Sequence, residues 1–380
     1  MTTSSPGTGR ELRTLVTAQG TVQMSLEEVP VPEPAPDEVI VRVEAAPINP
    51  SDLGLLFAGA DMATAAPSGP PGHPVLTAPL SPAAMRALAP RVGKSLPAGN
   101  EGAGTVIATG SSEAARALQG RAVALAPGGM YTEYRRARAG HCLALPAGVT
   151  PEEGASSFVN PLTALGMVET MRNEGHSGLV HTAAASNLGQ MLNRLCIEEN
   201  VPLVSIVRKP GQEHILRAIG AEHVCNSASP SFLEELTRAL TQTSATLAFD
   251  AIGGGDLASQ ILSCMEAASE KNSAAYSTYG SATHKQVYIY GGLDRGPTVL
   301  RRNFGMTWGI GGWLLSPFLQ SIGPARLHEL RERVGAGLKT TFASAYTKRI
   351  SLAEALQPEI CLAYARAATG EKYLVAPHKQ

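Results

Sequence analysis

A turn of small residues between an apolar run and a helical pattern is the first stretch of this sequence that can do chemistry. The run Leu179–Thr182 fits a buried strand, and residues 183–189 lead directly into a helix. A helix that begins after a parallel strand points unpaired N–H groups and a positive dipole end at an anionic ligand. Ala184, Ser186 and Gly189 occupy the glycine positions of the dinucleotide-binding pattern G-x-G-x-x-G. The context favours a pyrophosphate site, and an ordinary packed strand-to-helix turn is the alternative.

Two cations follow the next apolar run. Pro202–Val207 fits a second buried strand, and Arg208 and Lys209 come 19 and 20 positions after Gly189. An acidic residue near this point favours NAD, because it accepts hydrogen bonds from the ribose 2′-hydroxyl. Cations suit a 2′-phosphate instead. The pair therefore favours NADPH over NADH as the cofactor, unless both residues are only solvated loop charges.

The elements that must position these residues alternate from residue 178 onward. Strands are predicted at 179–182, 203–207, 222–225, 246–250 and 286–290, with helices at 188–198, 212–218, 230–240 and 257–268. This pattern predicts an α/β, doubly wound sheet, which binds ligands at the carboxyl ends of its strands. The further cofactor-binding candidates at those ends are Asn226, Ile252, Gly253, Tyr290, Gly291 and Gly292. Glycine also ends strands without any functional reason.

The N-terminal part has a different pattern. Residues 11–46 carry strand-type residues, and Asn49 is followed by Pro50, which together fit the start of a helix. Residues 62–98 are rich in alanine and proline and are predicted to form a long surface loop with one short helix. Further strands are predicted at 121–126 and 130–134. A final strand near the C-terminus is predicted to return to this β region.

Composition limits the classes of function. The chain has 380 residues, 44% of them hydrophobic, and a net charge of −1, so we expect two domains and neither a nucleic-acid nor a membrane partner. Its five cysteines form no C-x-x-C pair, which fits a reducing, cytoplasmic compartment. The most apolar segment, 304–319, is too short and too rich in glycine for a membrane span. Residues 1–16 contain no apolar stretch typical of a signal sequence.

Several short motifs, taken in order, resemble the medium-chain dehydrogenase/reductase superfamily. They are NPSD at 49–52, GNEGAGTV at 99–106, Thr163, the turn at 184–189, FDAIGG at 249–254 and GEKYLV at 370–375. The resemblance is closest to the zinc-independent quinone-oxidoreductase and enoyl-reductase branch. It implies a chaperonin-10-like β domain over 1–157, a Rossmann domain over 158–312, and a C-terminal return to the first domain over 313–380. It also implies a homodimer.

The resemblance assigns roles to individual residues. It implies that Thr163 lies near the nicotinamide and that the pyrophosphate is held at Ala185, Ser186, Asn187 and Leu188. Asn49 is expected to contact the nicotinamide ribose, and Asn49 and Tyr131 are the catalytic candidates. In zinc-dependent relatives the metal is held at the positions of Asn49, Asn100 and Val159. Amides and a valine do not replace thiolate and imidazole ligands, so no metal is expected.

The expected reaction is hydride transfer from NADPH to a small quinone or to the activated C=C bond of an enone. Hydrogen bonds must then meet the developing enolate, and a proton must reach the product. One alternative is an enoyl-thioester reductase, although Asp61 stands where that group has a tyrosine. The other alternative is a nucleotide-binding protein without enzymatic activity, as in the crystallin relatives of this family.

Overall fold

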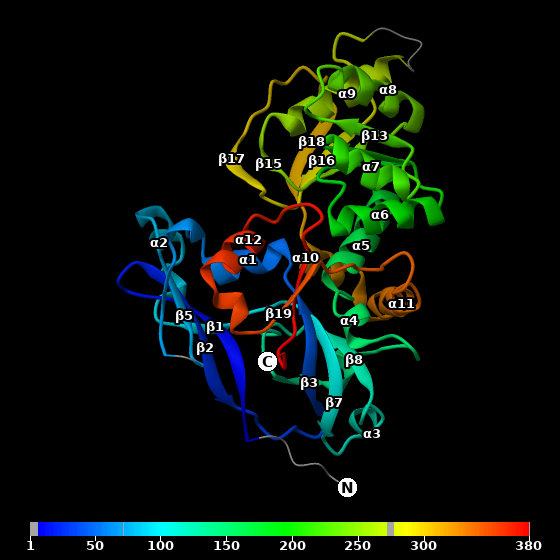
Figure 1. Cartoon of the computed structure of the whole chain (residues 1–380). Helices are drawn as coiled ribbons and strands as arrows, with labels where there is room; N and C mark the ends of the chain where they lie inside the picture. The colour runs from blue at the N-terminus through cyan, green and yellow to red at the C-terminus, as the bar shows by residue number, and fades with distance from the viewer. Residues whose placement is uncertain (1–6, 71, 272–276, 380) are drawn as a thin grey trace. The chain divides into compact units, whose positions relative to one another are not determined.

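The computed structural model describes residues 7–70, 72–271 and 277–379. The chain divides into two compact units (Figure 1). Unit 1 comprises Met1–Val159 and Arg331–Gln380, and unit 2 comprises Asn160–Leu330. The sequence analysis placed the second boundary at residue 312, but residues 313–330 cluster with unit 2. The reason is packing: Trp313 donates from Nε1 to Oγ1 of Thr170, a residue of unit 2, at 3.1 Å.

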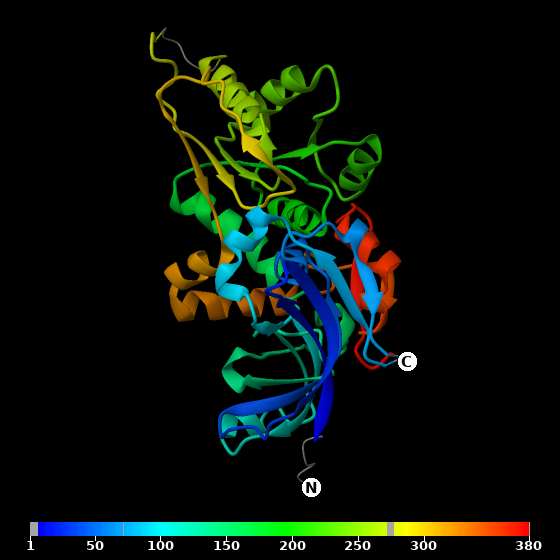
Figure 2. The same cartoon turned by 90° about the vertical axis from the view of Figure 1, so that its left-hand side faces the viewer.

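Unit 1 is built around two sheets. The first has the strand order β4-β5-β2-β1-β6, and the second has the order β10-β8-β7-β3-β20-β19, with β9 also paired to β3. Figure 2 shows the long antiparallel pair β1 and β2 in dark blue. The strands are β1 (Thr8–Val16), β2 (Thr21–Pro30), β3 (Glu38–Pro47), β4 (Ala66–Ser68), β5 (Val75–Pro79), β6 (Ser95–Pro97), β7 (Gly102–Thr109), β8 (Ala122–Leu125), β9 (Tyr134–Arg138), β10 (Leu143–Ala144), β19 (Lys348–Ile350) and β20 (Tyr373–Val375).

The C-terminal strand returns to the N-terminal region, as predicted. Strand β20 pairs antiparallel with β3 and parallel with β19. The helices of unit 1 are short, and proline at the first turn begins several of them. They are α1 (Pro50–Phe57), η1 (Met62–Thr64), α2 (Pro82–Ala87), η2 (Ala89–Arg91), α3 (Glu113–Arg116), η3 (Ala139–His141), α4 (Pro151–Gly154), η4 (Glu354–Leu356) and α12 (Pro358–Ala365).

Two sequence-based predictions of secondary structure were wrong, and two strands were not predicted. Residues 62–98 are not mainly a surface loop, because β4, β5 and β6 in this segment extend the first sheet and bury Leu76 and Ala78. The strand predicted at 130–134 lies at β9, four residues later. After residue 292 the chain adds β17 (Asp294–Thr298) and β18 (Trp308–Gly312) before it becomes helical. A strand of three to five residues gives only a short alternating pattern in the sequence, and the many prolines of 62–98 indicate a loop instead.

Unit 2 contains a six-stranded parallel sheet with the order β13-β12-β11-β14-β16-β18. Its strands are β11 (Leu179–His181), β12 (Leu203–Val207), β13 (His223–Asn226), β14 (Leu247–Asp250), β16 (Lys285–Ile289) and β18, and β15 (Gly253–Gly255) pairs separately with β17. The helices are α5 (Val159–Asn173), α6 (Asn187–Glu198), α7 (Pro210–Ala218), α8 (Phe232–Thr243), α9 (Leu257–Lys271), α10 (Leu315–Ser321) and α11 (Gly323–Ala336); α5 begins and α11 ends in unit 1.

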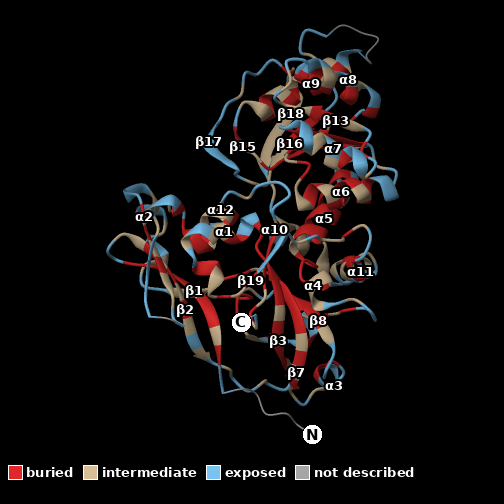
Figure 3. Ribbon diagram, viewed as in Figure 1, coloured by how far each residue is buried: buried red, intermediate tan, exposed pale blue. Residues whose placement is uncertain are grey.

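The central strands of unit 2 are buried on both faces of the sheet. Val180, Val204, Ala248 and Val287 form one apolar cluster with buried residues of α8 and α9. Successive strand residues point to opposite faces, so their neighbours face the other layer of helices. Every residue of β11, β12 and β14 is buried, as two-sided coverage requires. Figure 3 shows the same concentration of buried residues along β3 and β7 in unit 1.

No helix within the described residues combines the length and the apolar character needed to cross a membrane. Among the same residues, no group of three or more histidine, cysteine, aspartate or glutamate side chains is arranged to hold a metal ion. All five cysteines are free thiols.

Candidate functional site

The turn at 183–189 and the first turn of α6 are closely packed on each other. Ser186 caps α6, because its Oγ accepts a hydrogen bond from the Gly189 N–H at 3.2 Å. A Cβ atom on Gly189 would lie 2.1 Å from the carbonyl oxygen of Ala184. Only glycine fits at this position. Ala185, Ser186, Asn187 and Leu188 thus stand at the amino end of a helix that follows the parallel strand β11, as the phosphate-binding prediction requires.

The two cations lie where the next strand ends. Arg208 and Lys209 are exposed and directly follow β12. Their backbone N–H groups both donate to Oε1 of Gln212, at 2.9 and 3.1 Å, which holds the start of α7. The backbone is therefore fixed while the charged side chains reach solvent. This arrangement leaves both side chains accessible to an anion.

Asp250 organises the neighbouring strand end. Its Oδ1 accepts hydrogen bonds from Oγ1 of Thr182 at 2.7 Å and from the N–H of Ile252 at 2.9 Å. Its Oδ2 accepts from the N–H of Gly253 at 3.0 Å. The candidate residues Ile252 and Gly253 are thus held by a buried carboxylate. Asp250 and Thr182 were not among the site residues predicted from the sequence, although Asp250 lies inside the FDAIGG motif.

Tyr290, at the end of β16, is joined to a buried histidine. Its hydroxyl lies 2.7 Å from Nε2 of His181, and the two rings are stacked with centroids 5.7 Å apart. Burial lowers the pKa of His181 to about 3, so the ring stays neutral. The N–H of Tyr290 donates to the carbonyl of Asp250 at 3.0 Å. The pair fixes the tyrosine ring from the interior of the sheet.

The remaining candidates in unit 2 differ in their surroundings. A Cβ atom on Gly291 would lie 2.7 Å from the carbonyl oxygen of Ala251, whereas one on Gly292 would meet nothing within 4 Å. Asn226 donates to Glu213 at 2.7 Å, and Thr163 is buried in α5. Unit 2 therefore places most of the cofactor-binding candidates at the ends of its strands, and Thr163 on a helix.

Asn49 lies in a buried polar cluster of unit 1. It stands at the N-cap position of α1 as predicted, where its backbone N–H donates to Oδ2 of Asp52 at 2.8 Å and its side chain makes no capping hydrogen bond. Its Nδ2 donates to Oε1 of Glu101 at 2.8 Å. Its Oδ1 is buried and has no hydrogen-bond partner among the described residues. A buried acceptor without a partner is costly, so this oxygen is available to a ligand hydroxyl or N–H group.

Two carboxyl groups complete the cluster around Asn49. Oε2 of Glu101 accepts from the N–H groups of Phe158 and Val159, at 2.8 and 2.9 Å. Asp52 accepts from the N–H groups of Asn49 and Asn100, both at 2.8 Å. Burial raises the pKa of Asp52 to about 7, and the nearby Glu101 acts in the same direction. Neither Glu101 nor Asp52 was among the site residues predicted from the sequence.

Tyr131 belongs to the same cluster, but its hydroxyl already has a partner. The side chain is 1% exposed, and its Oη donates to the carbonyl oxygen of Pro47 at 3.2 Å. Burial, together with the charge of Asp52, raises the pKa of Tyr131 well above its ordinary value. The structure thus brings Asn49 and Tyr131 into one unit. The hydroxyl of Tyr131 is held by the carbonyl oxygen of Pro47, close to the residues of the cluster.

A lysine that the sequence analysis passed over lies beside these carboxyl groups. Lys372 donates from Nζ to Oγ of Ser156 at 2.7 Å. Burial lowers the pKa of Lys372 to about 8, against the opposing attraction of Glu101 and Asp52. The GEKYLV motif that contains Lys372 was the available signal.

The side chains at the positions that hold zinc in zinc-dependent members of the resembled superfamily do not suit Zn²⁺. Asn49 uses its Nδ2 on Glu101, Asn100 donates from Nδ2 to Oγ of Ser51 at 3.0 Å, and Val159 presents an alkyl group. Asp61, at the place of the expected tyrosine, caps η1 by accepting the Ala63 N–H at 2.9 Å. Neither set supplies thiolate, imidazole or phenol groups.

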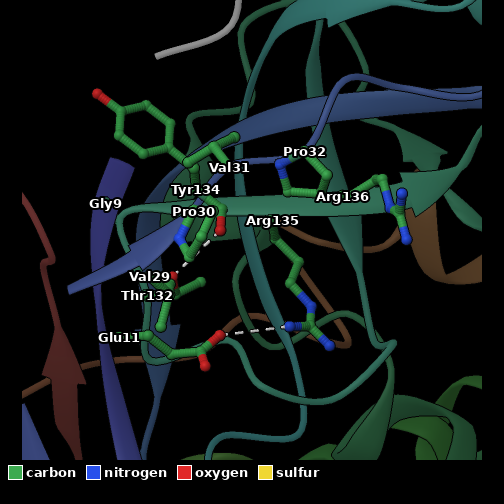
Figure 4. Close-up of a pocket in the computed structure, with 10 residues that line it drawn as sticks. All are labelled: Gly9, Glu11, Val29, Pro30, Val31, Pro32, Thr132, Tyr134, Arg135 and Arg136. Atoms are coloured by element: carbon green, nitrogen blue, oxygen red, sulfur yellow. Dashed lines mark hydrogen bonds and ion pairs between the residues drawn. The ribbon is translucent and has the colours of Figure 1, made fainter. Parts of the chain in front are cut away.

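A separate hollow in unit 1 is not the candidate site. Figure 4 shows it lined by β1, by residues 29–32 and by β9. Glu11 and Arg135 face each other across it, with Oε2 and Nη1 3.4 Å apart. None of the predicted site residues lines this hollow.

Comparison with curated proteins gives a partial match. No protein-family model matches the chain. The synaptic vesicle membrane protein VAT-1 homolog of Rattus norvegicus is 29% identical over 163 residues, and that of Homo sapiens is 30% identical over 163 residues. The matched segment is 42% of this chain, and 40% and 41% of those proteins. The chain therefore spans about two fifths of the length of these relatives.

Solved structures match over nearly the whole chain. A proposed NADPH:quinone reductase from Mesorhizobium loti has a TM-score of 0.73 at 27% identity, covering 99% of this chain and 100% of that one. A proposed NADPH:quinone reductase from Bacillus thuringiensis has a TM-score of 0.72 at 18% identity, covering 98% and 99%. A mutant enoyl thioester reductase from Candida tropicalis has a TM-score of 0.67 at 18% identity, covering 97% and 99%. The last two show the fold alone. These likenesses confirm the predicted fold class, a chaperonin-10-like β domain with a Rossmann domain.

Proposed function

We propose that this chain, a member of the medium-chain dehydrogenase/reductase superfamily on the side of its quinone oxidoreductases and enoyl reductases, reduces a quinone or an activated C=C bond with NADPH. The observation that carries the cofactor choice is the exposed pair Arg208 and Lys209 at the end of β12. The full-length likeness to a proposed NADPH:quinone reductase at 27% identity supports the reaction class. The assignment includes a reaction without zinc, a cytoplasmic location and a homodimer.

The residues of unit 2 are assigned to the cofactor. In this proposal the amino end of α6 binds the pyrophosphate through Ala185, Ser186, Asn187 and Leu188, and Arg208 and Lys209 bind the 2′-phosphate. Thr163, Asn226, Ile252, Gly253, Tyr290, Gly291 and Gly292 line the rest of the cofactor. Bound NADPH supplies the hydride. The rigid strand ends, held by Asp250 and His181, keep these groups in place before the cofactor arrives.

The residues of unit 1 are assigned to the polar chemistry. The unpartnered Oδ1 of Asn49 accepts a hydrogen bond from a ribose hydroxyl, and the second hydrogen of its amide remains for the substrate oxygen. Glu101 fixes the amide in this orientation by accepting the first hydrogen. Tyr131 supports the cluster through its bond to Pro47. A carbonyl-conjugated substrate suits this site, because its oxygen gains negative charge during reduction.

The test is a turnover measurement with a defined panel. We expect the purified full chain to oxidise NADPH in the presence of 1,2-naphthoquinone or a simple enone, and EDTA to leave the rate unchanged. A crotonyl thioester in the same panel tests enoyl-thioester reduction. Tight NADPH binding with no turnover of any compound would instead support a non-enzymatic nucleotide-binding protein. Loss of activity with the chelator, restored by zinc, would contradict the proposed mechanism.

A further inference from the structure

Three side chains from separate segments of unit 1 form a continuous hydrogen-bonded chain. Ser156 follows α4, Tyr346 precedes β19, and Lys372 precedes β20. The Nζ atom of Lys372 donates to Oγ of Ser156 at 2.7 Å, and this oxygen lies 2.9 Å from Oη of Tyr346. The ammonium group also lies 5.3 Å from the centroid of the Tyr346 ring. Ser156 is 1% exposed, and Tyr346 is half-buried. The chain therefore runs from a half-buried ammonium group through a buried hydroxyl to the phenol of a half-buried tyrosine.

The charges around this chain decide its protonation. Glu101 and Asp52 attract the ammonium group of Lys372, and burial acts against it, so its pKa falls to about 8. Burial raises the pKa of Tyr346, and the charges of Glu101 and Glu152 act in the same direction. The hydrogen bonds of its hydroxyl to Ser156 and Ser344 act in the opposite direction. At neutral pH the phenol is thus protonated, and the lysine is charged but close to losing a proton. A proton can therefore pass from Lys372 through Ser156 to Tyr346, and Lys372 can take up a new proton afterwards.

Anchoring of the C-terminal segment does not account for this arrangement. Other contacts already fix the segment: Lys379 pairs with Glu354 at 2.8 Å, and Arg349 pairs with Glu152 at 2.6 Å. Both of these cations lie at the surface, where an ion pair has a low desolvation cost. Lys372 is half-buried, and the partial removal of its ammonium group from water costs free energy that a surface ion pair avoids. The cost suggests that the position of this lysine has a functional reason.

We propose that Tyr346, Ser156 and Lys372 form the proton relay that completes the reduction. The inference rests on the proposed function, in which hydride addition leaves a negative charge on the substrate oxygen. Tyr346 gives its phenolic proton to that product anion, Ser156 gives its hydroxyl proton to the tyrosine oxygen, and the Lys372 ammonium gives a proton to the serine oxygen. Water then protonates the neutral amine. The substrate gains one hydride and one proton, and no group of the relay changes oxidation state.

Two variants test the relay through different members. We expect Tyr346→Phe, which keeps the ring, and Lys372→Met to lower kcat about 100-fold, with KM and the NADPH dissociation constant changed less than three-fold. The rate of the wild type should fall as pH rises above about 8, because Lys372 must carry a proton to refill the relay. Lys372→Arg should lower kcat as strongly as Lys372→Met, because arginine keeps the positive charge but does not release a proton to Ser156.

The matched control is Lys379→Met, which removes a nearby surface lysine and should leave kcat and the pH profile unchanged. Circular dichroism and thermal unfolding check that each variant is folded, and Tyr346→Phe keeps the test valid if Lys372→Met does not fold. Wild-type turnover with an unchanged kcat and pH profile in Tyr346→Phe would overturn the relay alone. Absence of wild-type turnover across the substrate panel would overturn the proposed function instead.

Discussion

At the scale of single residues, Arg208 is the most direct test of the cofactor assignment. Its guanidinium is exposed at the end of β12 and can form charge-assisted hydrogen bonds with a 2′-phosphate. Such bonds contribute about 1.5–3 kcal/mol each, so Arg208→Ala should raise the NADPH dissociation constant about ten-fold or more. The NADH dissociation constant should not change, because NADH lacks the phosphate.

Calorimetric titration of both coenzymes measures this selectivity. Arg238→Ala, an exposed arginine on α8, is the control and should leave both dissociation constants unchanged. Equal losses of NADPH and NADH affinity in Arg208→Ala would instead mean that the arginine maintains the shape of the turn.

The site residues differ in how far the sequence could predict them. Asn49 was predicted correctly as the cap of α1, since Asn-Pro is a local signal. Glu101 and Lys372 were not predicted, because each becomes important only where the fold brings it beside residues that are distant in the sequence. Asn49 lies 52 positions before Glu101, and Lys372 lies 271 positions after it (372 − 101). A charged residue in a strand motif is ordinarily exposed, and only the folded chain shows that these are not.

At the scale of elements, the contact between the 183–189 turn and α6 supports the proposed phosphate site. A Cβ atom on Gly189 would overlap the Ala184 carbonyl, so Gly189→Ala must displace the first turn of α6. Overpacking of this kind costs about 1–3 kcal/mol. We expect a lower free energy of unfolding by that amount and a clearly weaker affinity for NADPH.

The control for this prediction is another helical glycine in the same unit. A Cβ atom on Gly211, in the first turn of α7, would meet nothing within 4 Å. Gly211→Ala should therefore leave NADPH affinity unchanged and keep or raise the stability by up to about 1 kcal/mol. Urea unfolding of both variants, with and without NADPH, gives the comparison. An unaltered affinity in Gly189→Ala would rule out the close packing as a condition for binding.

Strands with a clear run of apolar residues could be predicted from the sequence, whereas very short or glycine-rich strands could not. The five predicted strands of unit 2 correspond to β11, β12, β13, β14 and β16. The signal is strongest in β12 and β14, in which every residue is buried. Strand β18 at the sheet edge was missed, since its sequence Trp-Gly-Ile-Gly-Gly carries glycines that weaken a strand signal. Strands β4 and β6 have three residues each, and only pairing with β5 and β1 defines them.

At the scale of the whole molecule, unit 1 is assembled from both ends of the sequence. Residues 331–380 supply β19, β20 and α12, and they bury Ile350, Tyr364, Tyr373 and Val375 in the apolar cluster of the N-terminal part. Sequence patterns indicate each strand but not which strands pair. The motif order made the return predictable through the family resemblance, and the pairing of β20 with β3 confirms it.

This discontinuity predicts that removing residues 331–380 will damage unit 1 selectively. Truncation after Leu330 leaves one edge of β3 near Ala46 without its β20 partner and exposes apolar side chains of the cluster to water. We expect faster amide exchange in β3, β7 and α1, whereas β11, β12 and β14 of unit 2 stay protected. Deletion of residues 379–380 alone, which removes a surface ion pair, should change neither set. Equal loss of amide protection in both units of the truncated chain would show that the sheet of unit 2 is unstable without a complete unit 1. That result would contradict the division into two self-contained cores.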